Sequence, residues 1–296
     1  MKLWGIDLGG TKIECVILKN GEPVIRQRLP TEADQGYAHI LSQIKKIIEQ
    51  VSTEIGEKPA KIGFATPGVL DSETNRMKNC NTVVMNGKPM KDDLEKLLKA
   101  EIKIANDANC FALAETLLGA GKDFPNAEVV FGVIMGTGVG GGLVVHQKII
   151  EGIHGIAGEW GHNILEENGE LCYCGKRGCV ETVISGVALE KFYQKISGKS
   201  LKLKEIVENY KQANDKYAIQ TIERLLEFYG RAISTLINVI DPNLIVIGGG
   251  VGNIDLLYTE GFERIKKYMF NPGNLKTHIC KPLLGDSAGV FGAALL

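Results

Sequence analysis

The sequence predicts two α/β domains, and two observations carry this prediction. Short apolar segments alternate with segments of helical periodicity along most of the 296 residues, which is typical of α/β proteins. A unit of strand, glycine turn and strand occurs at residues 2–18 and again at residues 127–146. A change in composition at residues 119–126 indicates the boundary. We therefore expect a smaller domain of residues 1–118 with a returning helix at about 284–296, and a larger domain of residues 119–283.

The composition narrows the class of partner. Hydrophobic residues make up 44% of the chain, enough to fill two cores, and 34 Lys and Arg residues balance 35 Asp and Glu residues. With this balance of charges, we expect no net electrostatic attraction of the protein to nucleic acid or to an anionic membrane. The longest apolar runs are too short to span a bilayer, and no leader precedes the first strand. We expect a cytoplasmic protein with a small-molecule partner and with neither a nucleic-acid nor a membrane partner.

The first glycine turn follows an apolar strand that ends at Asp7. The turn contains Gly9, Gly10, Thr11 and Lys12, and apolar segments follow at residues 13–18 and 24–29. The P-loop pattern, with a helix after it, is absent, so a phosphate here would be held by a hairpin. A plain tight turn is the alternative.

Polar residues come next at the carboxyl ends of two predicted strands. A helix is expected at residues 36–55 and a strand at residues 60–65, followed by a turn that contains Gly68. In open α/β sheets this end of a strand faces the ligand crevice. The polar segment 71–88, which contains Asn81, is either a solvated loop or a loop that faces a ligand.

Asn106 and Asp107 stand where a predicted strand (102–105) becomes a helix (110–118), after another helix at residues 89–98. Asp at a helix N-cap stabilises by about 1 kcal/mol, so helix capping is one interpretation of Asp107. The functional interpretation makes Asp107 a general base, with Asn106 beside it as a hydrogen-bonding partner for a polar ligand.

The second glycine turn spans residues 136–142, between strands 127–135 and 143–146. Aligning Asp7 with Gly136 aligns Gly9 with Gly138, and two such turns could hold a polyphosphate from two sides. Helices are expected at residues 187–196, 215–240, 255–268 and 288–296. A third turn, Gly248 to Gly250, follows strand 244–247 and suits either a nucleotide base or ribose, or close packing.

The segment from Gly158 to Cys179 predicts a metal site. Nine residues separate His162 from Cys172, one separates Cys172 from Cys174, and four separate Cys174 from Cys179. One imidazole and three thiolates complete a tetrahedral zinc shell of the structural type. Disulfides are the alternative, which the closeness of Cys172 and Cys174 disfavours.

Six segments together resemble the bacterial ROK sugar kinases of the sugar kinase, actin and Hsp70 superfamily. They are DLGGTK at Asp7–Lys12, NDANCFALAE at Asn106–Glu115, GTGVGGG at Gly136–Gly142, GEWGH at Gly158–His162, CYCGKRGCVE at Cys172–Glu181 and IDPNLIVIGGG at Ile240–Gly250. The resemblance covers nearly the whole chain in the family's order. It implies an α/β, two-domain fold of the actin-like or ribonuclease H-like ATPase type, and a homodimer.

The resemblance also implies ATP-dependent phosphorylation of a hexose on its 6-hydroxyl. Asp107 would accept the hydroxyl proton, and Asp7 would hold Mg²⁺ through water. The phosphates and adenosine would lie against the three glycine turns, at Gly9, Gly10, Thr11, Lys12, Gly136, Thr137, Gly138, Gly248, Gly249 and Gly250. The sugar would contact Gly68, Asn81, Asn106, Asp107, Glu159, His162 and Glu181. His162 would bind zinc through one ring nitrogen and meet a sugar hydroxyl with the other.

Residues 81–89 and 159–162 resemble the fructokinase and mannokinase branch more than the glucokinases. We therefore rank fructose or mannose first as substrate, N-acetylglucosamine second, and glucose or broad hexose use third. Sugar-responsive ROK transcriptional regulators are the alternative of another class. The balanced charge and the phosphate turn at residue 7 lead us to expect no DNA-binding domain. Polyphosphate remains an alternative phosphate donor.

Overall fold

The computed structural model describes residues 2–272 and 274–296, and the chain divides into two compact units of nearly equal size. Unit 1 is Met1–Lys122, Gln147–Ala157 and Leu283–Leu296, and unit 2 is Asp123–His146 and Gly158–Pro282. The sequence instead predicts a boundary at residue 119, a larger second domain, and residues 147–157 within it. Ile149 explains the difference, because it packs with Ala65, Ala105 and Cys110 of unit 1.

Unit 1 is built on a five-stranded sheet with the order β3-β2-β1-β4-β7. The strands are β1 (Lys2–Leu8), β2 (Lys12–Lys19), β3 (Glu22–Pro30), β4 (Lys61–Thr66) and β7 (Glu101–Asn106). The first three are antiparallel, whereas β4 runs parallel to both β1 and β7. A small second sheet pairs β5 (Val69–Leu70) with β6 (Met77–Lys78). The parallel strands therefore bring Asp7 and Asn106 to the same end of the main sheet.

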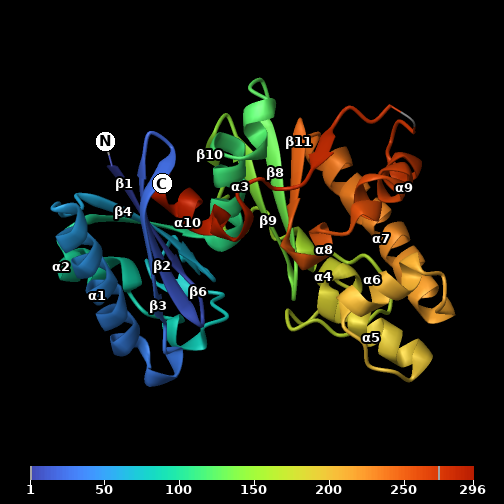
Figure 1. The fold of residues 1–296 in the computed structure, drawn as a ribbon, viewed down its shortest axis with the longest axis horizontal. Helices are drawn as coiled ribbons and strands as arrows, with labels where there is room; N and C mark the ends of the chain where they lie inside the picture. Colours follow the sequence, from blue (N-terminus) through green and yellow to red (C-terminus); the bar gives the residue numbers. More distant parts are fainter. Residues whose placement is uncertain (1, 273) are drawn as a thin grey trace. The chain divides into compact units, whose positions relative to one another are not determined.

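Helices cover both faces of this sheet (Figure 1). One face carries α1 (Tyr37–Ile55) and α2 (Met90–Leu98), with Ile6 and Leu8 packed in one core with Ile44 and Ile47 of α1. The other carries α3 (Asp107–Leu117) and α10 (Ala288–Ala294). Here α10 touches the strand backbone, since a β-carbon at Gly63 would lie 1.8 Å from the Ala293 carbonyl oxygen. The final helix of the chain thus completes the unit that its first residues begin.

Unit 2 repeats the plan of unit 1. The second five-stranded sheet has the order β10-β9-β8-β11-β12, and its strands other than β10 belong to unit 2. The strands are β8 (Val129–Met135), β9 (Val139–Val145), β10 (Lys148–Ile149), β11 (Leu244–Gly248) and β12 (His278–Cys280). As in the first sheet, an antiparallel hairpin, β8-β9, is joined to two parallel strands, β11 and β12. The repeat seen in the sequence is therefore a repeat of sheet topology.

The second glycine turn is shorter than the sequence predicts. Residues 139–142 belong to strand β9, with Gly142 opposite Gly132 and Val139 opposite Met135. The run of glycines predicts a turn, but the segment is a strand. Glycine is required at position 141 because the Trp160 ring packs directly against the strand there. Only Gly136, Thr137 and Gly138 form the turn.

The helices of unit 2 pack into one large core with β8 and β11. They are α4 (Val180–Ile184), α5 (Gly186–Ser197), α6 (Leu203–Lys211), α7 (Lys216–Ile240), α8 (Gly249–Gly252) and α9 (Glu260–Tyr268). Helix α6 is absent from the sequence prediction, and the predicted helix 255–268 is divided at Thr259 into a 3₁₀ turn and α9. Within residues 2–272 and 274–296, no helix combines the length and apolar character required to cross a membrane.

Candidate functional site

The first glycine turn closes on itself at the end of β1. The backbone N–H of Gly9 donates to the carbonyl of Lys12 (3.0 Å), and the Thr31 hydroxyl donates to the Gly9 carbonyl (2.6 Å). Lys12 already belongs to β2. A β-carbon at Gly10 would lie 3.4 Å from the Thr82 hydroxyl oxygen, so the turn approaches the polar loop that follows β6. Gly9 thus shapes the turn, and its N–H is already used within it.

Asn81 lies in that loop, whose neighbouring residues are firmly held. The Asn86 side chain accepts a hydrogen bond from the Cys80 N–H (2.9 Å) and donates one to the Cys80 carbonyl (3.1 Å). Gly68, at the end of β4, packs against the same segment, because a β-carbon there would lie 2.5 Å from the Cys80 sulfur. The structure therefore brings Gly68 and Asn81 to the same region of unit 1 as the first glycine turn.

Asn106, and not Asp107, caps helix α3. Asn106 has extended backbone geometry (φ −63°, ψ 149°), and its side-chain oxygen accepts a hydrogen bond from the Ala108 N–H at 2.9 Å. Asp107 is the first helical residue, and its carboxylate accepts from the same N–H at 2.8 Å. Capping is therefore supplied by the neighbour, which weakens the explanation of Asp107 as a structural cap alone.

Asp7 and Asp107 influence one another electrostatically. Burial raises the pKa of Asp7 to about 6, and the negative charges of Asp107 and Glu14 act in the same direction. Lys12 opposes the shift. A carboxylate whose pKa is raised by neighbouring negative charges lies in a region that favours a cation, and carboxylate and water oxygens are the ligands that Mg²⁺ prefers. The residues present therefore fit the predicted magnesium site.

Glu14 is a residue of this region that sequence reasoning missed. Its side chain is only 1% exposed, and it forms ion pairs with Arg26 and with Arg28, the latter at 2.7 Å. On the sheet, Glu14 is directly opposite Asp7 on one side and Arg28 on the other. The signal was available: an acid in a buried strand, followed by two arginines two residues apart in the next strand.

The second glycine turn is braced by Glu181. The Gly136 N–H donates to the Gly138 carbonyl (2.9 Å), and the Gly186 N–H donates to the Gly136 carbonyl (2.8 Å). One carboxylate oxygen of Glu181 accepts a hydrogen bond from the Val139 N–H at 3.0 Å. Glu181 therefore joins this turn to the segment that begins helix α4.

The third glycine cluster contains a strand end and a short helix. Gly248 ends β11, and Gly249 begins α8 with a left-handed backbone (φ +81°). A β-carbon at Gly249 would lie 2.3 Å from the Met135 carbonyl, whereas no described atom lies within 4 Å of that position at Gly250. Close packing thus accounts for Gly249, and Gly250 is the one of the pair that leaves space.

The segment from Gly158 to His162 lies flat against strand β9. Gly158 has φ +97°, and a β-carbon there would lie 2.4 Å from the Gly141 carbonyl, so only glycine fits. The Trp160 ring N–H donates to the Gly140 carbonyl at 3.0 Å. These contacts fix the 3₁₀ turn η4 (Trp160–His162), and with it the backbone of His162.

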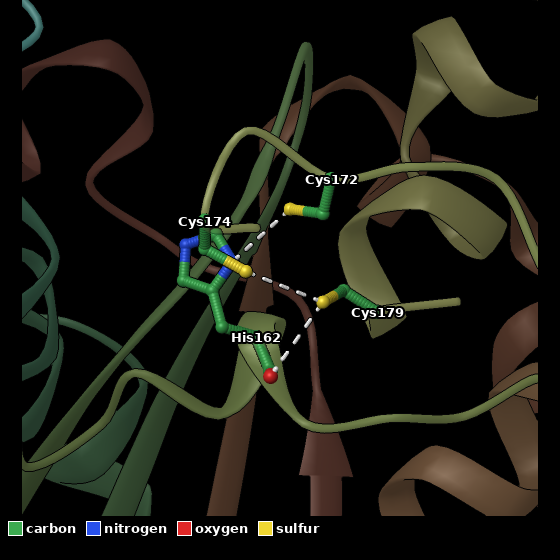
Figure 2. A group of neighbouring side chains, drawn as sticks. All are labelled: His162, Cys172, Cys174 and Cys179. Carbon is green, nitrogen blue, oxygen red and sulfur yellow. Dashed lines mark hydrogen bonds between the residues drawn. The ribbon is translucent and has the colours of Figure 1, made fainter. Parts of the chain in front are cut away.

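The structure brings together all four residues of the predicted metal site (Figure 2). Their ligand atoms all lie within 4.8 Å of one another, with Cys172 Sγ at 3.5 Å from His162 Nδ1 and Cys174 Sγ at 3.6 Å from Cys179 Sγ. Metal bonds of about 2.3 Å to sulfur and 2.0 Å to nitrogen place neighbouring ligands about 3.5 to 3.8 Å apart in a tetrahedron. The site therefore fits zinc, and its cysteines form no disulfide.

The second ring nitrogen of His162 points away from the sulfur atoms. Its Nε2 lies 2.9 Å from the hydroxyl of Tyr173 and 3.9 Å from the carboxylate of Glu159. Tyr173 is a second residue that the sequence analysis missed, although its place between two predicted metal ligands was a signal. Nδ1 of His162 therefore faces the cysteine cluster, and Nε2 faces the polar groups of Tyr173 and Glu159.

The two sheets of identical strand order, each with a glycine turn in its first hairpin, define the actin-like ATPase fold of the sugar kinase, actin and Hsp70 superfamily. Within that class, a sequence profile of the ROK family matches residues 3–296, and the chain belongs to the ROK family.

Three relatives are similar to this chain over nearly their full lengths. The chain is 36% identical over 304 residues to an N-acetyl-D-glucosamine kinase of Vibrio atlanticus, covering 99% of this chain and 98% of that protein. A ROK hexokinase from Thermus thermophilus has 30% identity and a TM-score of 0.89, covering 100% of this chain and 97% of the other. A ROK family glucokinase from Streptomyces griseus, in complex with glucose and AMPPNP, has 25% identity and a TM-score of 0.79, covering 99% and 98%.

Proposed function

We propose that this chain is an ATP-dependent kinase that phosphorylates N-acetylglucosamine on its 6-hydroxyl. ATP-dependent sugar phosphorylation is supported by the family and by the relatives. The observation that carries the choice of sugar is the 36% identity to an N-acetyl-D-glucosamine kinase over 99% of the chain. Fructose or mannose, the first choice from the sequence, is not supported, because the curated relatives of 34% to 36% identity are N-acetyl-D-glucosamine kinases. N-acetylglucosamine was the second choice.

In unit 1, Asp107 accepts the proton of the sugar hydroxyl as the oxygen attacks the γ-phosphate. Its place at the first turn of α3 supports this role, because Asn106 supplies the cap in its stead. Asp7 would hold Mg²⁺, which when bound would supply charge neutralisation for the transferring phosphate. Since the N–H of Gly9 is used within its turn, Gly10, Thr11 and the Lys12 side chain face the phosphates. Gly68, Asn81 and Asn106 contribute to sugar binding.

In unit 2, Thr137 and Gly138 provide backbone N–H groups for the phosphates, and Gly250 leaves space for adenosine. Glu159, His162 and Glu181 offer polar groups to vicinal sugar hydroxyls. His162, Cys172, Cys174 and Cys179 would hold zinc, which would perform no chemistry on the sugar. Held in this way, the His162 ring would keep one orientation.

An assay that couples ADP release to a spectroscopic signal tests the proposal, with a panel of N-acetylglucosamine, N-acetylmannosamine, glucose, fructose and mannose. We expect the highest kcat/KM with N-acetylglucosamine and ATP. A preference for fructose or mannose would refute the choice of sugar. Absence of ADP release with every sugar would refute the kinase assignment. Polyphosphate in place of ATP serves as the control for the phosphate donor.

A further inference from the structure

Tyr173 is an exposed aromatic residue enclosed in sequence by two predicted metal ligands. Its side chain is 77% exposed, although large aromatic side chains are usually covered. Its hydroxyl lies 2.9 Å from His162 Nε2, and its ring meets the imidazole edge-on, with centroids 5.0 Å apart and planes at 87°. Within the described part of the chain, this is the one hydrogen bond of the Tyr173 side chain.

In the His162 ring, only the N–H at Nε2 is left to form a hydrogen bond with Tyr173. Nδ1 faces the Cys172 sulfur at 3.5 Å, so Nδ1 is the nitrogen that would bind the metal. A neutral imidazole with a metal on one nitrogen carries its proton on the other, and that N–H donates one strong hydrogen bond. In this structure the Tyr173 hydroxyl oxygen lies in position to accept it. The proposed function assigns the same N–H to a sugar hydroxyl.

We propose that Tyr173 occupies the sugar-hydroxyl position on His162 when the sugar is absent, and that the sugar displaces it. This inference rests on the proposed function. The phenol satisfies and orients the imidazole in the empty site, as a sugar hydroxyl does in the filled one. Displacement is feasible because the Tyr173 side chain is mostly in solvent, so it can turn away from His162 without leaving a packed core.

The consequence is a reduced affinity for any sugar that uses this position. One hydrogen bond must be broken before the sugar can bind, and the net stabilisation from such a bond corresponds to roughly a 2- to 10-fold change in an equilibrium constant. A sugar that lacks the relevant hydroxyl leaves Tyr173 in place and is not affected. Tyr173 therefore lowers the affinity for the complete sugar relative to one deoxy analogue.

Calorimetric titration of the zinc-loaded protein with N-acetylglucosamine, without ATP, tests the proposal. We expect Tyr173→Phe to lower the dissociation constant about 2- to 10-fold. Among monodeoxy analogues, one should show no gain, and it identifies the hydroxyl that binds His162. Tyr217→Phe on helix α7 is the matched control, since no hydrogen bond to its hydroxyl is found among the described residues. An unchanged or higher dissociation constant for Tyr173→Phe overturns the proposal.

A second measurement does not depend on this variant. With 3-fluorotyrosine incorporated at position 173 alone, the fluorine resonance should shift and sharpen when N-acetylglucosamine is added, because the ring leaves His162. A resonance that is unchanged at saturating sugar overturns the proposal. If the wild-type protein neither binds nor phosphorylates any sugar of the panel, the proposed function fails. If it is active and Tyr173→Phe has no effect, only this inference fails.

Discussion

Replacing Asp7 with asparagine should stabilise the folded chain while abolishing its activity. Asp7 lies in β1, and burial is the largest cause of its raised pKa of about 6, to which the charges of Asp107 and Glu14 add. In the unfolded chain the same carboxyl titrates near 3.8. The folded state therefore favours the protonated form. This contribution to stability is complete below about pH 4 and is lost as the pH rises through 6, so at pH 8 ionised Asp7 costs folding free energy.

The size of this cost follows from the shift. About two pKa units correspond to about 3 kcal/mol, and partial solvent exposure reduces this to about 1 to 3 kcal/mol. Asp7→Asn should raise the free energy of unfolding by that amount at pH 8, and by about half as much at pH 5. The assay is urea unfolding at both pH values in EDTA without nucleotide. A variant that is equal to or less stable than wild type at pH 8 would refute the reasoning.

Glu14 provides a matched control of opposite sign. It is paired with Asp7 across the β1-β2 hairpin. Although burial opposes its ionisation, hydrogen bonds from Arg26 and Arg28 lower its pKa. Its folded-state pKa is therefore depressed, and its contribution is present at neutral pH and lost as the pH falls through the folded pKa. Glu14→Gln should lower the free energy of unfolding at pH 8 by about 1 to 3 kcal/mol.

Three further predictions concern the proposed catalytic, metal and core residues. Asp107→Asn should lower kcat at least about 100-fold while the sugar dissociation constant stays within about 3-fold; steady-state kinetics and calorimetry check this, and near-wild-type turnover would contradict the base assignment. The purified protein should contain about one zinc per chain, and Cys174→Ser should lose both zinc and sugar affinity; metal analysis that finds no zinc in wild type would contradict the site. Tyr229→Phe should raise the free energy of unfolding by about 1 kcal/mol, because the fully buried Tyr229 hydroxyl has no hydrogen-bond partner among the described residues. Loss of stability in urea unfolding would show that the hydroxyl is satisfied.

Local chemistry in the sequence was sufficient to locate much of the candidate site. The spacing of His162 and the three cysteines predicts four side chains that the structure does bring together. The duplicated strand, glycine turn and strand is found again in two sheets of the same order. Each of these depends on residues close in sequence, where spacing nearly determines geometry.

What the sequence did not reveal depends on contacts between distant segments. Gly140 and Gly141 were predicted to lie in a turn, because their neighbours in the sequence do not reveal that Trp160 packs on them. Residues 147–157 were predicted to belong to the second domain, because the residues on which Ile149 packs lie far upstream in the sequence. The hydrogen bond of Tyr173 to His162 joins residues whose side-chain directions depend on the folded loop. The proposed sugar likewise rests on similarity over the whole chain and not on two short segments.

The packing of α10 has a consequence for how the chain is synthesised. All five strands of the first sheet have been synthesised once the chain reaches Asn106. Helix α10, which covers part of one face of this sheet, begins only at Ala288. At ordinary rates of translation, the sheet waits roughly 10 to 40 s for that helix. During this interval the strand backbone at Gly63, which α10 later touches, lacks that cover. Unit 1 therefore reaches its final state only after α10 has been synthesised, when the residues of unit 2 already precede it on the chain, although the sequence of unit 1 begins first.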